Sequence, residues 1–143
     1  MQRRSQNRIL VVEDNDDLRA SITEILALNG FLASGAEHGK AALDQLSQSP
    51  TPPALILLDL NMPVMDGTTF LHRLKQIPHF RQIPILLMTA QPMPSPLEVA
   101  ALLPKPFAAN ALLSLVERFV SARRRKSAAK KRKHGVAAKV LRT

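Results

Sequence analysis

The sequence predicts an α/β domain built on a parallel sheet that helices cover on both faces. Short runs of almost only apolar residues alternate along the chain with segments whose apolar residues have helical spacing. Strands that alternate with helices in this way form βαβ units, whose strands run parallel. Parallel strands are buried on both faces, which explains why the runs are continuously apolar. The 143 residues are enough for one such domain with a sizeable core.

The first strand is predicted at Arg8–Val12, where the apolar run RILVV ends at two acids. A helix should follow, because Asp16 or Asp17 can cap its first turn and apolar residues recur behind them. Gly30 marks its end, since glycine accepts the left-handed conformation that often follows a helix. The apolar side of this helix comprises Leu18, Ile22, Ile25 and Leu26.

The middle of the chain predicts two further strands and two short helices. Phe31–Ser34 is a weak second strand, and the helix Gly39–Leu46 after it ends before the proline-rich run at 49–53. The apolar run at 54–59 is the third strand, and a helix over Thr68–Gln76 follows it.

The last third predicts a fourth strand at Ile83–Met88 and a long helix from Ala108 to at least Val120. Between them, three prolines exclude a helix before Ser95. The run Ser-Pro-Leu-Glu that begins there is typical of a helix start, but it leaves space for two turns at most. A fifth short strand should then begin at Leu102.

Charge is distributed unevenly along the chain, whose formal net charge is +9. Residues 1–120 hold 10 Lys and Arg against 11 Asp and Glu, whereas residues 121–143 hold 10 Lys and Arg and no acid. We therefore expect an N-terminal extension at 1–7, a nearly neutral domain at 8–121, and a basic tail at 122–143 that is disordered or extends the last helix. Such a tail favours a polyanionic partner, although a solvated extension without a partner has the same composition.

Composition also excludes several kinds of protein. The sequence contains no Cys, so it can form neither disulfides nor thiolate metal sites. Its apolar runs are far shorter than the roughly 18 residues that a membrane helix requires. Its first residues lack the long apolar stretch of a signal peptide.

Functional groups follow the predicted strands at the point where each strand ends. Glu13 and Asp14 follow the first strand, and Asp59 ends the third. Thr89 follows the fourth strand, and Lys105 follows the last. Because the carboxyl ends of parallel strands share one edge of the sheet, we expect these five side chains to converge there.

The five groups have the chemistry of a site for phosphate and a divalent metal ion. Clustered carboxylates raise one another's pKa unless a cation lies between them. A hard ion such as Mg²⁺ accepts one or two carboxylates together with phosphate oxygens. A hydroxyl can donate a hydrogen bond to a phosphoryl oxygen, and an ammonium can neutralise its charge. The set therefore fits phosphoryl transfer to a carboxylate.

At these residues the sequence resembles the receiver domain of bacterial two-component response regulators. The resemblance rests on VVEDNDDLR, LILLDLNMPVMDG, LLMTA and PKPF, which occur in the family's order and with approximately its spacing. It covers about Arg8–Val120. It implies a flavodoxin-like, doubly wound sheet of five parallel strands in the order 2-1-3-4-5, here with a shortened fourth helix.

The resemblance implies that Asp59 is the nucleophile that takes a phosphoryl group from a phosphohistidine on a histidine kinase or a phosphotransfer protein. Asp14 would bind Mg²⁺, or Mn²⁺, directly, and Glu13 would bind it directly or through water. Asp59 and the backbone carbonyl of Asn61 would complete the protein ligands. The chain would accept and lose phosphate at Asp59 without otherwise being an enzyme.

Further roles follow from the same resemblance. Thr89 would hydrogen-bond the phosphoryl group and signal its presence, and Lys105 would pair with it. The bond between Lys105 and Pro106 would be cis. Asn61 and Gln91 would influence the water that hydrolyses the phosphoaspartate.

Each of these residues also has an ordinary structural explanation. Asp59 alone would fit a loop acid or a helix cap, and Glu13-Asp14 alone would fit a turn. Lys105 without the acids would be a solvated surface charge. The four motifs together favour a phosphorylatable site, with a degenerate receiver as the alternative.

Two departures from the family concern the output rather than the chemistry. Only 15 residues separate Thr89 from Lys105, several fewer than is usual in the family. Leu102 stands where the family commonly has the Tyr or Phe that moves inward on phosphorylation. We therefore expect an intact receiving site and an output surface that is remodelled or has a different partner.

The favoured hypothesis is a single-domain, cytoplasmic response regulator that works through contact with a downstream protein. Its upstream partner would be a histidine kinase or a phosphotransfer protein. One alternative is a receiver-like adaptor that acts without phosphorylation. Another is a regulator whose tail, residues 122–143, binds nucleic acid non-specifically; the tail also suits an anionic membrane. It contains no aromatic residue for base stacking.

Overall fold

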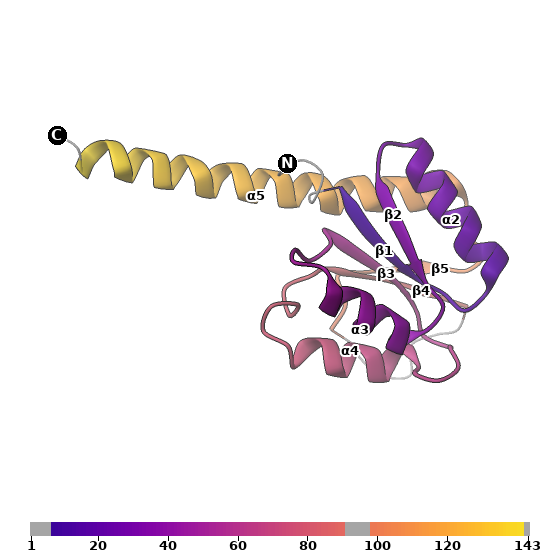
Figure 1. Ribbon diagram of the computed structural model, residues 1–143. Coiled ribbons are helices and arrows are strands. Elements are labelled where there is room, and N and C mark those ends of the chain that lie inside the picture. The colour runs from indigo at the N-terminus through magenta and orange to yellow at the C-terminus, as the bar shows by residue number, and fades with distance from the viewer. Residues whose placement is uncertain (1–6, 91–97, 142–143) are drawn as a thin grey trace.

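The computed structural model describes residues 7–90 and 98–141 of the chain. Five parallel strands form one sheet in the order β2-β1-β3-β4-β5, which confirms the predicted fold class and strand order (Figure 1). The strands are β1 (Arg8–Val12), β2 (Leu32–Ala36), β3 (Leu55–Asp59), β4 (Ile85–Thr89) and β5 (Ala101–Pro104).

Helices cover both faces of the sheet (Figure 1). α2 and α5 pack on one face, and α3 and α4 pack on the other. Because both faces are covered, every residue of β3 and β4 is buried, which explains why both strands are apolar up to their last residue. The helices are α2 (Asp16–Leu28), α3 (Gly39–Gln48), α4 (Gly67–Lys75) and α5 (Ala109–Leu141).

The start of α2 differs from the prediction in its cap. Asn15, rather than Asp16 or Asp17, is the N-cap, and its side chain accepts a hydrogen bond from the N–H of Leu18. The two aspartates lie in the first turn, where their charge interacts favourably with the helix dipole. Gly30 follows the helix with a φ of 87°, the left-handed conformation that the sequence predicts.

The strand boundaries shift by a few residues from their predicted positions. β4 begins at Ile85 instead of Ile83, because the intervening Pro84 has no N–H to donate to a neighbouring strand. Only the carbonyl of Pro84 pairs, by accepting a hydrogen bond from the N–H of Ile56 at 3.1 Å. β2 continues two residues beyond its predicted end.

The predicted short helix before β5 lies partly outside the described residues, since its start at Ser95 is not among them. Residues 98–100 are described and are not helical. The N–H of Ala100 donates to the carbonyl of Ile85 at 2.8 Å, so the chain already pairs with β4 there. β5 begins at Ala101, one residue earlier than predicted.

α5 is much longer than is needed to cover the sheet. Leu112, Val116 and Val120 form its buried stripe, and Val120 is the last buried residue among the α5 side chains that are described. Beyond it the helix continues to Leu141 and projects away from the domain (Figure 1). Despite this length, none of the described helices has the apolar character needed to cross a membrane.

Candidate functional site

Three carboxylates meet at the carboxyl-terminal edge of the sheet. Glu13 and Asp14 follow β1, and Asp59 is the last residue of β3, which lies beside β1. One oxygen from each of the three side chains lies within 4.8 Å of the other two. The parallel register of β1 and β3 brings the residues after each strand to the same edge. The structure therefore brings these three acids together, as the strand ends predict.

The donor set fits a hard divalent cation. Glu13 and Asp59 are only 1% and 6% exposed, whereas Asp14 is exposed to solvent. Oε2 of Glu13 is buried and has no hydrogen-bond partner within the described part of the chain. A buried carboxylate oxygen without a partner is costly, and a cation that prefers oxygen ligands would satisfy it.

Lys105 reaches the same acids from the end of β5. Its Nζ lies 2.8 Å from Oε1 of Glu13 and 3.7 Å from Oδ1 of Asp59. The pairing of β4 with β5 places it there, because the N–H of Lys105 donates to the carbonyl of Thr89 at 2.7 Å. The peptide bond that follows Lys105 is cis, as the resemblance implies.

The pKa of Glu13 reflects the balance of charge at the site. Burial raises the pKa of Glu13 from 4.5 to about 7, and the neighbouring carboxylate of Asp59 adds to the rise. Lys105 opposes this rise by stabilising the charged form. Since the pKa remains raised, one ammonium group does not compensate for two buried carboxylates, and the site favours a second cation.

The other predicted site residues differ in their exposure. Thr89 is buried at the end of β4, with 8% of its surface exposed. Asn61 is exposed, and its N–H donates to Oδ1 of Asp59 at 3.4 Å. Leu102 is 45% exposed on β5, so its side chain is partly in solvent. Gln91 lies outside the described residues, and its predicted role stays a prediction.

The loop from Asp59 to α4 depends on a close backbone approach. The N–H of Gly67 donates to the carbonyl of Leu60 at 2.9 Å, and a Cβ on Gly67 would lie 2.6 Å from the carbonyl oxygen of Asp59. Asp66 begins α4 by accepting a hydrogen bond from the N–H of Thr69 at 2.8 Å, and this bond lowers the pKa of Asp66. Asp66 therefore caps the helix and is not part of the carboxylate cluster.

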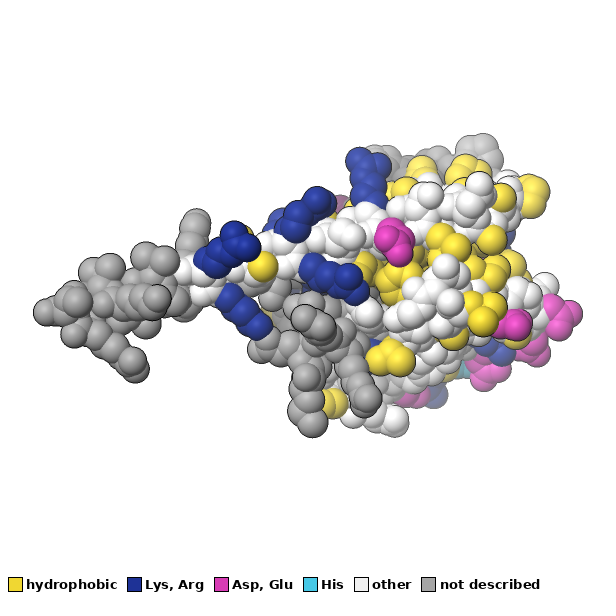
Figure 2. Space-filling model, turned by 90° about the horizontal axis from the view of Figure 1, so that it is seen from above, with side chains coloured by type: hydrophobic (Ala, Val, Ile, Leu, Met, Phe, Trp, Pro, Cys, Tyr) yellow, Lys and Arg dark blue, Asp and Glu magenta, His cyan; other side chains and the backbone are white. Residues whose placement is uncertain are grey.

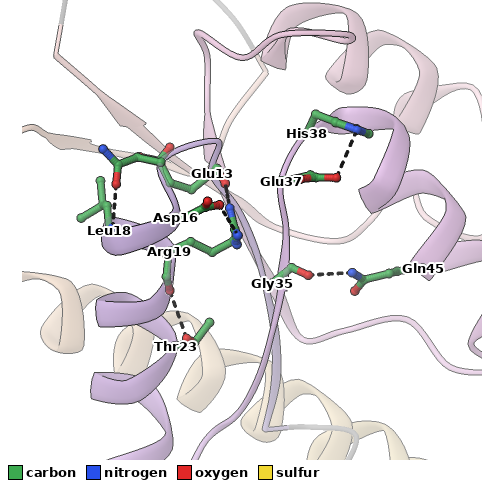
Figure 3. A network of polar contacts seen from close by, with 10 residues as sticks. Glu13, Asp16, Leu18, Arg19, Thr23, Gly35, Glu37, His38 and Gln45 are labelled. Carbon is green, nitrogen blue, oxygen red and sulfur yellow. Dashed lines mark hydrogen bonds and ion pairs between the residues drawn. The ribbon is translucent and has the colours of Figure 1, made fainter.

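Arg19 of α2 supports the turn that carries Glu13 and Asp14 (Figure 3). Its Nη1 donates to the backbone carbonyl of Glu13 at 2.8 Å, and its Nη2 lies 2.6 Å from Oδ1 of Asp16. Its aliphatic carbons lie against Gly35 of β2, where a Cβ would come within 2.9 Å of Cδ. Sequence reasoning missed Arg19, although a basic residue one helical turn after Asp16 was an available signal.

Comparison with known proteins points to one family. A family profile described as the response regulator receiver domain matches residues 9–117. The sensor histidine kinase TmoS of Ectopseudomonas mendocina is 36% identical to this chain over 123 residues, which are 81% of this chain and 12% of TmoS. Across TmoS and seven further curated relatives, the chain spans between 12% and 48% of the relative's length.

Solved structures share the fold. The signal receiver domain of a signal transduction histidine kinase from Syntrophus aciditrophicus has a TM-score of 0.73 and 30% identity, over 81% of this chain and 91% of that one. The receiver domain of the sensor histidine kinase PA1611 from Pseudomonas aeruginosa has a TM-score of 0.73 at 24% identity, over 80% and 98% of the two chains. That structure has a magnesium ion coordinated in its active site cleft.

Proposed function

Since this chain belongs to the family of response regulator receiver domains, we propose that it is a phosphoacceptor of a two-component phosphorelay and that Asp59 receives the phosphoryl group. The observation that carries the proposal is the position of Asp59, whose buried carboxylate lies within 4.8 Å of the two acids that follow β1 and 3.7 Å from Nζ of Lys105. A receiver domain is not an enzyme in the ordinary sense, because the group that it modifies is its own side chain.

Transfer requires Asp59 to attack phosphorus as a carboxylate. An oxygen of Asp59 forms a bond to phosphorus while the bond from phosphorus to the imidazole nitrogen of a phosphohistidine breaks, and the imidazole leaves. The ammonium of Lys105 lies 3.7 Å from Oδ1 of Asp59, beside the atom that attacks phosphorus. It also stabilises the negative charge of the phosphoryl group that arrives.

Glu13, Asp14 and Asp59 would hold Mg²⁺, or Mn²⁺, together with the backbone carbonyl of Asn61. When bound, the ion supplies positive charge beside the phosphoryl oxygens. The buried Oε2 of Glu13, which has no partner within the described residues, supports this assignment. The magnesium ion in the PA1611 receiver supports it from a protein of the same fold.

Thr89 and Lys105 would hold the phosphoryl group after transfer, with Asn61 and Gln91 modulating its hydrolysis. Thr89 ends β4 beside Lys105, so a hydroxyl and an ammonium can reach one group from adjacent strands. Leu102 lacks an aromatic ring that could report a movement of Thr89, so we propose that the output surface on β5 differs from the family's aromatic switch.

The proposed donor is a phosphohistidine on a histidine kinase or a phosphotransfer protein in the cytoplasm, and the output is contact with a downstream protein. Residues 8–121 would form the receiver unit for both contacts, and residues 122–143 a basic extension of it. The relative TmoS, which is named a sensor histidine kinase, supports a partner from the same signalling system.

The substitution Asp59→Asn tests the proposal against an adaptor that acts without phosphorylation. The parent chain should gain a slower band on a phosphate-affinity gel after incubation with acetyl phosphate and Mg²⁺, and Asp59→Asn should not. Asp66→Asn is the matched control, because Asp66 is a nearby acid that caps α4, and it should shift like the parent. A shift that persists in Asp59→Asn would reject Asp59 as the acceptor.

A further inference from the structure

We propose that the α5 extension, residues 121–141, binds double-stranded nucleic acid through the phosphate backbone without regard to base sequence. The extension begins after Val120, the last of the described α5 side chains to be buried on the sheet. It is continuous with the part of α5 that the domain core holds, and Arg124 donates to the side chain of Asn7 near its base. The domain therefore carries the extension as part of one helix.

Positive charge is concentrated on the first half of the extension. Seven of the ten residues 123–132 are Lys or Arg, and all seven are at least partly exposed. No Asp or Glu follows Glu117 in the sequence, so the extension itself contains no acidic residue. Figure 2 shows these cations on several sides of the projecting helix and the acidic side chains on the domain.

The cations repeat every two helical turns. The repeats are Arg123 with Lys130, Arg124 with Lys131, and Arg125 with Arg132. Residues seven apart lie about 10 Å apart along a helix axis and face the same way, so charge runs along the helix in several rows. The 21 residues of the extension span about 30 Å, which is close to one turn of B-form DNA, roughly 34 Å.

Repulsion within the extension favours a polyanionic partner. Lys126 and Lys130 are four residues apart, and Arg123 and Lys126 are three apart, which are the spacings at which like charges destabilise a helix. A row of phosphates would neutralise these charges, and the displaced counterions would add to the affinity. Residues 1–120 carry an excess of only one acid over their Lys and Arg residues, which is small beside the charge of the extension.

The residues between the cations favour a duplex over a membrane or a single strand. Within 121–132 they are only Ser and Ala, so this part lacks the bulky apolar side that anchors an amphipathic helix in lipid. No Phe, Tyr or Trp follows Phe119, so the extension lacks the side chains that stack best on the bases of a single strand. Ionic contact with closely spaced phosphates is the interaction that remains, and a duplex presents the densest phosphates.

The test measures binding of the full chain to a fluorescent DNA duplex of about 24 base pairs by anisotropy. Duplexes of unrelated sequence should bind within about twofold of one another, and Kd should rise at least about tenfold between roughly 50 and 200 mM salt. Asp59→Asn should bind the duplex like the parent. A failure of duplex binding is therefore distinguishable from a failure of the phosphoacceptor function. Sequence-selective binding, or no binding at about 50 mM salt, would overturn the inference.

Two matched double variants identify the surface that binds the duplex. Lys126→Gln/Lys130→Gln removes two charges from the extension, and Lys40→Gln/Arg73→Gln removes two exposed charges from α3 and α4. The first pair should reduce the slope of log K against log salt by about 2, because each phosphate contact contributes about 0.9. The second pair should leave the slope unchanged, and circular dichroism checks that both variants keep their helices. The proposal is rejected if both double variants reduce this slope equally. It is also rejected if the chain binds phosphatidylserine vesicles more tightly than the duplex.

Discussion

Lys105 and Glu13 form an ion pair of 2.8 Å across the carboxyl-terminal edge of the sheet, although 92 positions separate them in the sequence. The same ammonium lies 3.7 Å from Asp59, so two buried carboxylates share one cation. The site is therefore short of positive charge before any ligand arrives. This shortage is the physical reason to expect that both metal binding and phosphoryl transfer depend on the balance between these residues.

Replacing the shared cation should slow the chemistry. Lys105→Met should lower the initial rate of phosphorylation by acetyl phosphate by about tenfold or more, because a hydrogen bond to a charged group contributes about 1.5–3 kcal/mol. Lys40→Met, at an exposed position of α3, should keep the rate of the parent. A Lys105→Met rate within about twofold of the parent would show that the ammonium does not assist transfer.

Glu13 should give the metal-free protein an unusual pH dependence. Its folded-state pKa of about 7 exceeds the ordinary 4.5, so the folded chain retains this proton at pH values where the unfolded chain has lost it. The free energy of unfolding should therefore fall as the pH rises through this interval, by at most about 3 kcal/mol from this group. Urea unfolding in EDTA at about pH 5 and about pH 8 measures the effect.

The control for this pH dependence is an exposed glutamate of α2. Glu13→Gln should flatten the fall in stability because it has no proton to lose, whereas Glu24→Gln should retain it. If the parent and Glu13→Gln lose the same stability between the two pH values, the burial of Glu13 is not the cause.

Gly67 should be intolerant of any side chain. The Cβ of Gly67→Ala would lie 2.6 Å from the carbonyl oxygen of Asp59 and 2.8 Å from Cα of Leu60, both of which are backbone atoms. We expect a loss of about 1–3 kcal/mol in the free energy of unfolding. Gly35→Ala, whose three nearest atoms all belong to the flexible side chain of Arg19, should cost less. Equal losses in the two variants would contradict the packing argument.

Arg19 should affect metal affinity without contacting the metal. Arg19→Ala removes the hydrogen bond to the carbonyl of Glu13, so the turn before Asp14 loses its support. The Mg²⁺ concentration for half-maximal phosphorylation should rise about tenfold, as is typical of residues that orient metal ligands. Arg73→Ala removes an exposed arginine from α4 and should leave that concentration unchanged. If Arg19→Ala needs the same Mg²⁺ concentration as the parent for half-maximal phosphorylation, Arg19 does not position the metal ligands.

The central strands could be predicted from sequence because burial on both faces leaves them continuously apolar. β3 is buried at every residue, and its run of Leu and Ile admits few other interpretations. β2 was a weaker prediction for a physical reason. It is an edge strand whose Leu32 is half exposed and whose Ser34 and Gly35 interrupt the apolar pattern. The length of α5 was left open because its basic residues carry no apolar periodicity.

The sequence could predict that the site residues converge, but it could not predict which of them form the closest ion pair. Strand ends place Glu13, Asp59 and Lys105 at one edge of a parallel sheet in any such fold. That Lys105 bonds Glu13 more closely than Asp59 depends on differences of about 1 Å in side-chain position, which no sequence spacing encodes. The cap of α2 was ambiguous for a similar reason, since Asn15 and the aspartates that follow are equally good caps.

Intact mass after incubation with acetyl phosphate and Mg²⁺ tests the central claim most directly. The parent chain should gain the mass of one phosphoryl group, and it should gain none when EDTA replaces Mg²⁺. Asp59→Asn should gain none under either condition, because an amide cannot accept the group in place of the carboxylate. A parent chain without any mass gain, or an Asp59→Asn chain that gains the same mass, would contradict the assignment of Asp59 as the phosphoacceptor.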